Sequence, residues 1–299
     1  MALHSIVLVK QVPDTANISG DVMRPDGTVN RAKLPAIFNP EDKVALELAL
    51  QLKDQHGGAV TVLTMGPPPA VRILRQSLYM GADRAILLSD RRFAAADTLA
   101  TSYALSKAVE RIGDFDLILG GRQAIDGDTA QVGPQTAEKL GIPQITYTQE
   151  IMEFAPEARE LTVRRAISDG YEILQAPLPV LLTTVKEAAD PRPFNVRRLC
   201  HYKHAKSRFE LETLEDTSHN LNWADEMLDD LKAQGLYIET WSIEDIGAEV
   251  EKCGLAGSPT KVHKVENVVL SGSEFTQVEP SAEGLGRMID DLQQDHIFG

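Results

Sequence analysis

The stretch of residues 120–134 combines glycines, carboxylates and hydroxyls in a way that could bind an anionic ligand. It follows the short apolar segment 116–119 and runs into a helical pattern at 135–140. The first turn of a helix carries backbone N–H groups without an internal partner, and the helix dipole adds partial positive charge there. Gly127 and Gly133 would let the backbone approach a ligand closely. The order of strand, glycine-bearing turn and helix therefore predicts an anion site.

Three side chains of this stretch narrow the choice of ligand. Thr129 is an expected N-cap, and its hydroxyl could also reach a phosphate oxygen. No lysine follows the second glycine, so the stretch is not a Walker A loop. Asp126 and Asp128 suit ribose hydroxyls or an adenine amino group better than phosphate oxygens. On residue types alone, an ordinary capped helix in an α/β domain is an equally good interpretation.

Composition limits the classes of partner. The 299 residues include 44 acidic and 30 basic side chains, for a net charge of -14, which disfavours nucleic acids and anionic membranes as partners. The two cysteines, Cys200 and Cys253, indicate no disulfide framework and fit a reducing compartment. The N-terminus lacks the pattern of a signal peptide, and no apolar run is long enough to span a membrane. We therefore expect a cytoplasmic protein without membrane insertion.

Apolar runs alternate with helical periodicity over the first 150 residues. Strands are predicted at 5–9, 59–65, 84–88 and 117–119, and helices at 39–55, 97–111 and from after the break at 66–69 to Met80. This alternation predicts an α/β fold with a doubly wound, mostly parallel sheet. Ligands of such sheets lie beyond the C-terminal ends of the strands.

The predicted strand ends could converge on the 126–133 turn. They are Val9-Lys10, Met65-Gly66 and Gly120-Gly121. This agreement favours a nucleotide site over a plain capped helix. The GxGxxG fingerprint is absent, so an orthodox NAD site is not expected.

The pattern changes after residue 150. Short strands at 150–154, 161–167 and 171–174, with an Asp169-Gly170 turn, predict a small antiparallel extension before a buried strand at 178–185. Residues 186–199 are expected to form an exposed loop, 205–250 an acidic helix-and-linker tail, and 283–294 a terminal amphipathic helix. We therefore divide the chain into an α/β domain at 1–205 and a linker with a C-terminal arm at 206–299.

Several motifs resemble those of one family along nearly the whole chain. They are Lys10-Gln-Val-Pro-Asp14, Asn39-Pro40, Met80–Asp83, Val163–Leu174 and Pro179–Thr183. Together they resemble the β subunit of electron transfer flavoproteins, including the nitrogen-fixation-associated branch. Ser168 departs from the pattern, because an acid is usual there. The resemblance implies a Rossmann variant like that of adenine nucleotide hydrolases.

Two further segments, Asp126–Pro134 and Gly254–Val262, resemble the electron-bifurcating branch of that family. There the β subunit holds a second FAD, whereas housekeeping members hold AMP in this subunit. The resemblance and the strand ends together predict the residues that frame the nucleotide: Leu8, Asn39, Pro40, Asp42, Met65, Gly66, Ala124, Asp126, Gly127, Asp128, Thr129, Ala130, Gln131, Val132, Gly133 and Gln135.

The resemblance also implies partners. The C-terminal arm is expected to pack on an electron transfer flavoprotein α subunit. A loop at about 187–200 would recognise an acyl-CoA-type dehydrogenase, with Val196 as its apolar anchor. NADH would donate a hydride to the FAD, and ferredoxin or flavodoxin would receive one electron. The chemistry would belong to the flavin within the complex, so no catalytic side chain is predicted.

Three alternatives remain beside this interpretation. Residues 200–204, Cys-His-Tyr-Lys-His, are expected to be a surface segment rather than a metal site, because no second Cys or His cluster lies near them. A carrier with one FAD, held mainly by the α subunit, and a structural AMP in this subunit is the main functional alternative. A nucleotide-binding regulator that binds ATP and folds alone is disfavoured by the antiparallel segment and the proline-bearing loop.

Overall fold

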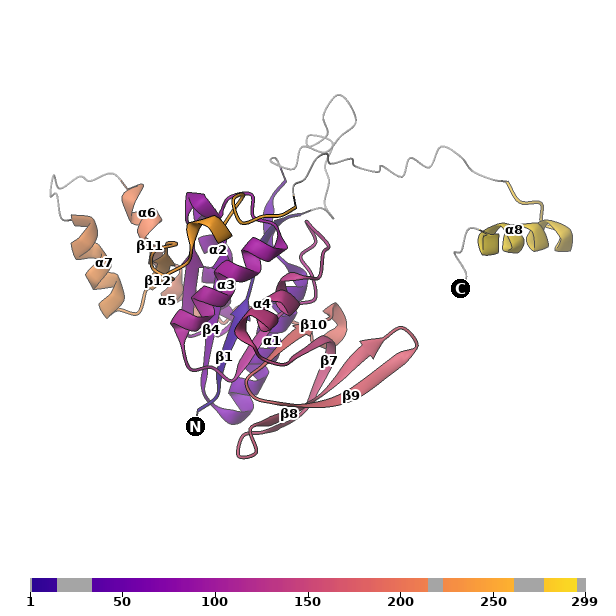
Figure 1. Ribbon diagram of the computed structural model, residues 1–299, viewed down its shortest axis with the longest axis horizontal. Coiled ribbons are helices and arrows are strands. Elements are labelled where there is room, and N and C mark those ends of the chain that lie inside the picture. The colour runs from indigo at the N-terminus through magenta and orange to yellow at the C-terminus, as the bar shows by residue number, and fades with distance from the viewer. Residues whose placement is uncertain (1, 15–33, 215–222, 261–276, 295–299) are drawn as a thin grey trace, which may run out of the picture. The chain divides into compact units, whose positions relative to one another are not determined.

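The fold centres on one large sheet, with helices on both of its faces (Figure 1). The computed structural model describes residues 2–14, 34–214, 223–260 and 277–294. The ten strands lie in the order β11-β12-β5-β4-β1-β6-β10-β7-β8-β9, and all neighbours are parallel except β7-β8 and β8-β9. The predicted doubly wound, mostly parallel sheet is thus confirmed.

The strands of this sheet are β1 (His4–Leu8), β4 (Ala59–Met65), β5 (Arg84–Leu88), β6 (Leu117–Gly121), β7 (Gln144–Ala155), β8 (Glu160–Ile167), β9 (Gly170–Pro177), β10 (Val180–Thr184), β11 (Lys206–Ser207) and β12 (Tyr237–Trp241). A separate antiparallel pair joins β2 (Gln11–Pro13) and β3 (Ala36–Phe38). The helices are α1 (Pro40–His56), α2 (Val71–Met80), α3 (Thr98–Ile112), α4 (Val132–Leu140), α5 (Val196–Tyr202), α6 (Arg208–Glu212), α7 (Trp223–Ala233) and α8 (Ala282–Gln294).

Alternate residues of the central strands point into two separate cores. Val7, Val62 and Leu119 pack with the buried faces of α1 and α2. Ile6 and Ile118 pack with α3 and α4 on the other side of the sheet. Because both faces are covered, the strands read as continuous apolar runs.

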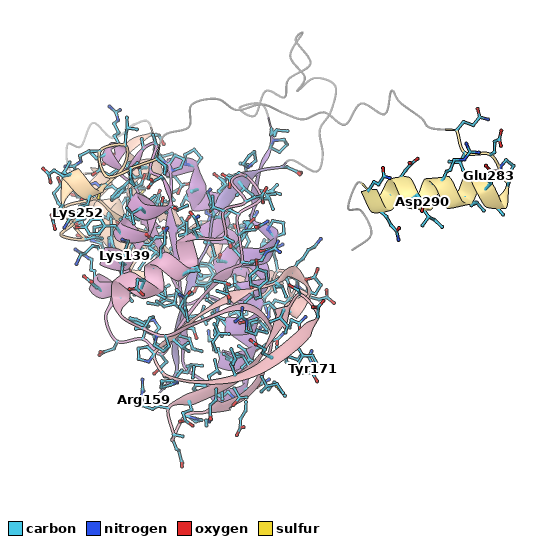
Figure 2. All side chains as sticks on the ribbon, turned by 45° about the vertical axis from the view of Figure 1, so that its right-hand side comes forward. Lys139, Arg159, Tyr171, Lys252, Glu283 and Asp290 are labelled. Carbon is cyan, nitrogen blue, oxygen red and sulfur yellow. The ribbon has the colours of Figure 1, made fainter. Side chains whose placement is uncertain are left out.

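The antiparallel extension carries the sheet beyond β10. β8 and β9 pair from Glu160↔Pro177 to Ile167↔Gly170, and Gly170 adopts φ 153, which the tight turn requires. Figure 2 shows Arg159 and Tyr171 at opposite ends of this extension. Leu161 and Val163, both in β8, are buried, so the hairpin belongs to the first core.

Two expectations for the second half were wrong. The stretch 205–250 is no mere tail, because β12 joins the edge of the sheet by pairing with β5 through Glu239↔Ile86. Residues 1–262, which hold the sheet, form one compact unit, and residues 263–299 form a second unit that contains α8. The second concerns the exposed loop predicted at 186–199, which is irregular only from 189 to 195. A 3-10 turn covers Lys186–Ala188, and Asn195 caps α5 by accepting from the Arg198 N–H.

Candidate functional site

The C-terminal ends of three adjacent strands, β4, β1 and β6, converge as the sequence predicts. Leu8, the last residue of β1, lies in register with Leu63 on one side and Gly120 on the other. Met65 ends β4, and the Gly66 N–H donates to the Leu88 carbonyl at 3.1 Å. Leu8, Met65 and Gly66 therefore lie along one edge of the sheet.

The start of α1 fastens the loop that follows β6. The Asn39 side chain, fully buried, donates to the Gln123 carbonyl at 2.9 Å and accepts from the Ile125 N–H at 3.3 Å. Glu41 accepts from the Arg122 guanidinium and from the Gln123 N–H, both at 2.9 Å. Pro40 occupies the first helical position, where no N–H is needed. Glu41 lies between the predicted Pro40 and Asp42, but its contacts with the loop after β6 were not predicted.

Asp42 joins the ends of β1 and β6 from the same helix turn. Its carboxylate accepts from the Lys10 N–H at 2.8 Å and from the Gly121 N–H at 3.0 Å. Burial raises the pKa of Asp42 to about 7, against the lowering effect of these hydrogen bonds. A Cβ on Gly121 would lie 2.5 Å from an Asp42 carboxylate oxygen, so only glycine allows this approach.

Residues 124–128 form a hydrogen-bonded turn. The Ala124 carbonyl accepts from the N–H groups of Gly127 and Asp128 at 3.2 and 2.9 Å. The Lys10 ammonium binds both oxygens of Asp126 at 2.8 Å. The Gln123 amide donates to Asp128 at 2.9 Å. These contacts hold the two carboxylates of the loop beside the end of β1.

The backbone of the loop is strained at two non-glycine residues. Asp128 and Ala130 have φ values of 48 and 53. Such conformations cost of order 1–3 kcal/mol for a residue like alanine, and they cluster at functional sites. Ala130 is followed by Gln131 in the right-handed region, with φ -102 and ψ -28. A left-handed residue next to a right-handed one directs successive N–H groups to one side, which forms a nest for an anion.

Helix α4 begins at Val132, earlier than the predicted Gln135, and its N-cap is Gln131. Thr129 is therefore not the N-cap. The helix can start before Pro134 because a first-turn residue needs no N–H partner. No side chain caps this helix start in the described part of the chain, so its first-turn N–H groups remain available.

Two glutamines link α4 to the neighbouring helix. The Thr98 hydroxyl donates to the Gln131 side chain at 2.9 Å, and the Ser102 hydroxyl donates to Gln135 at 3.3 Å. Asp97 caps α3 and also accepts from Thr260 at 2.7 Å, so the described part of the 254–262 motif lies against the start of α3. Lys261 and Val262 of that motif lie outside the described residues.

The two glycines singled out in the sequence have different surroundings. A Cβ on Gly133 would lie 2.7 Å from the Thr183 side chain, so this glycine lets α4 pack on β10. A Cβ on Gly127 would meet nothing within 4 Å, and its φ is not positive. Neither neighbouring atoms nor backbone conformation therefore requires glycine at position 127.

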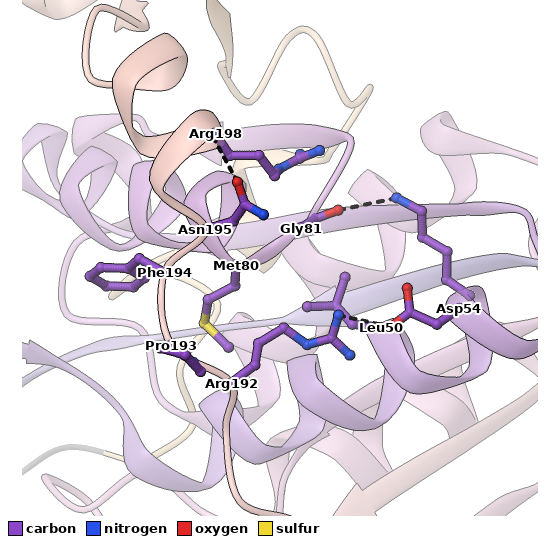
Figure 3. A pocket seen from close by; sticks show the side chains of 10 residues that line it. Leu50, Asp54, Met80, Gly81, Arg192, Pro193, Phe194, Asn195 and Arg198 are labelled. Carbon is purple, nitrogen blue, oxygen red and sulfur yellow. Dashed lines mark hydrogen bonds and ion pairs between the residues drawn. The ribbon is translucent and has the colours of Figure 1, made fainter.

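The strand-end site is an open surface rather than an enclosed cavity. Gly127, Asp128, Thr129 and Gln131 are exposed, whereas Ala130, Val132, Gly133 and Gln135 are partly buried. Two cavities of about 410 Å³ lie elsewhere: one beneath the 189–195 segment (Figure 3), the other between α1 and the antiparallel extension. Polar groups and uncapped N–H donors converge at the strand ends, which therefore suit an anionic ligand better than either cavity.

Val196 lies away from this site, at the start of α5, and 75% of it is exposed. Cys200 is exposed on the same helix, and Cys253 is buried; both are free thiols. Within the described ranges, no group of three or more His, Cys, Asp or Glu side chains could hold a metal ion. No helix in the described segments is long and apolar enough to cross a membrane.

Comparison with known proteins agrees with the motifs. The electron transfer flavoprotein domain matches residues 26–216. An electron transfer flavoprotein subunit beta of Clostridium acetobutylicum is 39% identical over 296 residues, which cover 99% of this chain and 100% of the relative. Protein FixA of Azorhizobium caulinodans is 43% identical over 268 residues, or 88% of this chain and 84% of the relative. Subunit CarD of the caffeyl-CoA reductase-Etf complex of Acetobacterium woodii is 40% identical over 298 residues, or 99% and 95%.

Proposed function

The chain belongs to the family of electron transfer flavoprotein β subunits, in the branch that includes FixA, and on that basis we propose that its strand-end site binds FAD in an electron-bifurcating heterodimer. The observation that carries this proposal is the uncapped start of α4 behind a loop that Asn39, Glu41 and Asp42 fasten to the strand ends. A helix start of this kind stabilises a phosphate or diphosphate.

The described residues fit the adenosine diphosphate half of FAD. The N–H groups at Gln131, Val132 and Gly133 would hold phosphate oxygens. Asp126 and Asp128 supply acceptors for ribose hydroxyls or the adenine amino group, and Gly127 leaves room for close approach. Leu8, Met65 and Gly66 would line the floor at the strand ends.

The chain's own residues position the cofactor and shape its electrostatic surroundings. Bound FAD would supply hydride acceptance from NADH and single-electron donation, one electron going to ferredoxin or flavodoxin and the other through an α-subunit FAD to an acyl-CoA-type dehydrogenase. Lys10 is neutralised by Asp126, and Arg122 by Glu41, so neither cation is a free counter-ion for a flavin anion.

The openness of the site supports a partner subunit that covers it. We propose that an electron transfer flavoprotein α subunit does so and that α8 also packs on that subunit. Leu285, Met288, Ile289 and Leu292 follow the spacing of one helix face, and Leu285 and Ile289 are 49% and 47% exposed. An exposed apolar face on a helix suits a groove on another protein.

The dehydrogenase would dock at Val196, whose side chain is also exposed. Among the relatives, CarD is named as a subunit of a complex with a caffeyl-CoA reductase, which supports an acyl-CoA-type partner for this chain. The exposed free thiol of Cys200 fits a reducing compartment, and we place the complex in the cytoplasm.

A one-FAD carrier with AMP in this subunit is the second candidate, because an uncapped helix start would accept an AMP phosphate equally well. The two candidates differ in cofactor content. The αβ heterodimer should be purified, its nucleotides released by denaturation, and FAD and AMP counted per heterodimer. Two FAD molecules support bifurcation, and one FAD with one AMP supports the carrier.

A further inference from the structure

The segment 189–195, which precedes Val196, has no regular secondary structure, yet it is attached to α1 by an ion pair between Arg192 and the buried Glu47. The Glu47 carboxylate accepts three hydrogen bonds from Arg192: from the backbone N–H at 3.0 Å, from Nε at 2.8 Å and from Nη2 at 3.0 Å. The Gln51 amide donates to the same carboxylate at 3.0 Å. Glu47 is only 4% exposed, so these hydrogen bonds replace the water that its carboxylate would otherwise contact.

Further contacts fix the segment on the same side of the molecule. The Arg192 guanidinium also reaches Asp54 at 2.9 Å (Figure 3). The Asn195 N–H donates to the Tyr79 carbonyl at 3.0 Å, and the Phe194 ring meets the Tyr79 ring edge-on at a centroid distance of 5.4 Å. The segment thus contacts both α1 and α2.

The first turn of α5 is held as well. The Arg198 guanidinium donates to the Leu78 carbonyl at 2.7 Å and to the Ala82 carbonyl. Val196 therefore lies between two fixed points, Arg192 and Arg198, while its own side chain stays exposed.

These contacts hold the segment on α1 in the absence of a partner. A buried carboxylate without its partner destabilises the folded state strongly. The Arg192–Glu47 pair therefore opposes any departure of the segment from α1. An irregular segment that is ordered in advance does not lose that conformational freedom on binding. We therefore expect Val196 to keep one position in the free chain.

We propose that Arg192 is a positioning residue that locks residues 189–196 onto Glu47 and so preforms the surface carrying Val196. This inference rests on the proposed docking role of Val196, but the lock itself is a property of the free chain. It can therefore be tested without any partner.

The test measures hydrogen exchange of the full-length chain, read by mass spectrometry on peptides that cover residues 189–196. Glu47→Gln keeps the side-chain shape but removes the charge, and Arg192→Lys keeps the charge but removes the fork of N–H donors. We expect exchange in this segment to accelerate about tenfold or more in Glu47→Gln, and less in Arg192→Lys.

A spin label provides a second measurement. Cys200 is exposed on α5 and can be labelled, whereas Cys253 is buried. A nitroxide attached to Cys200 should gain mobility in both variants, with Cys200→Ser as the labelling control. The matched variant is Glu239→Gln, which removes a comparable two-bond pair with Arg84 between β5 and β12. It should leave the exchange and the label mobility near Val196 unchanged.

Two outcomes would overturn the proposal. One is exchange at 189–196 within about twofold of the wild type in folded Glu47→Gln and Arg192→Lys. The other is an equal acceleration in Glu239→Gln, which would indicate general loosening. Failure of the docking role is separate, because it would appear as unimpaired dehydrogenase binding by Val196→Asp while the lock still holds.

Discussion

Replacing Asp42 by asparagine should change how the stability of the chain depends on pH. Burial raises the pKa of this carboxyl from 3.8 to about 7, so the folded state binds a proton more tightly than the unfolded state. The stabilising effect of that proton is fully present below pH 3.8 and is lost as the pH rises through about 7.

The size of the effect follows from the two pKa values. A difference of about three pKa units corresponds to about 4 kcal/mol over the whole window. Between pH 5 and pH 8, the wild type should lose about 2–3 kcal/mol through this group. Asparagine cannot ionise, so the variant lacks this loss. It does lose one acceptor for the N–H groups of Lys10 and Gly121, at a cost of about 1–2 kcal/mol that is the same at both pH values.

The assay is urea unfolding of the full-length wild type and Asp42→Asn at pH 5 and pH 8. The contributions of other titrating groups to the unfolding free energy cancel when the two proteins are compared at each pH. We expect the difference in unfolding free energy to move by about 2–3 kcal/mol in favour of the variant on going to pH 8. A difference that stays constant within about 0.5 kcal/mol would refute the assignment of a raised pKa to Asp42.

Other expectations concern the glycines and Val196. Gly133→Ala should lower the free energy of unfolding by about 1–3 kcal/mol, because its Cβ would lie 2.7 Å from Thr183. Gly127→Ala should leave urea stability unchanged but weaken nucleotide retention, and equal retention would argue against close approach of the ligand at that residue. Val196→Asp should weaken dehydrogenase binding in a binding titration about tenfold or more while cofactor content stays at the wild-type level. Unchanged affinity would remove Val196 from the docking surface.

Most of the central sheet could be predicted because its strands are buried on both faces. The segments 59–65 and 84–88 read as apolar runs with clear boundaries, and the structure places β4 and β5 at those residues. β12 was missed because it is a short strand with polar residues, Glu239 and Thr240, within an acidic stretch. Its pairing with β5 connects residues about 150 positions apart, which local patterns do not reveal.

The site was predictable in outline and not in its internal contacts. Strand ends and a glycine-bearing turn indicate where a ligand would lie, since parallel strands expose their carboxyl ends at one edge. Asp42 was expected to contact the nucleotide, and no separate role was predicted for Glu41. The structure shows that Glu41 and Asp42 instead accept from backbone N–H groups of Gln123, Lys10 and Gly121. Such contacts depend on how α1 packs against β6, and they have no signature in the sequence.

The most direct test of the strand-end site is the cofactor content of the αβ heterodimer with Asp128→Leu, measured beside the wild type. The bulky apolar side chain would replace a carboxylate in the loop that precedes α4. We predict two FAD molecules per wild-type heterodimer and a single FAD in the variant, with the α-subunit flavin retained. Full occupancy of both sites in the folded variant would contradict the placement of the nucleotide at this loop.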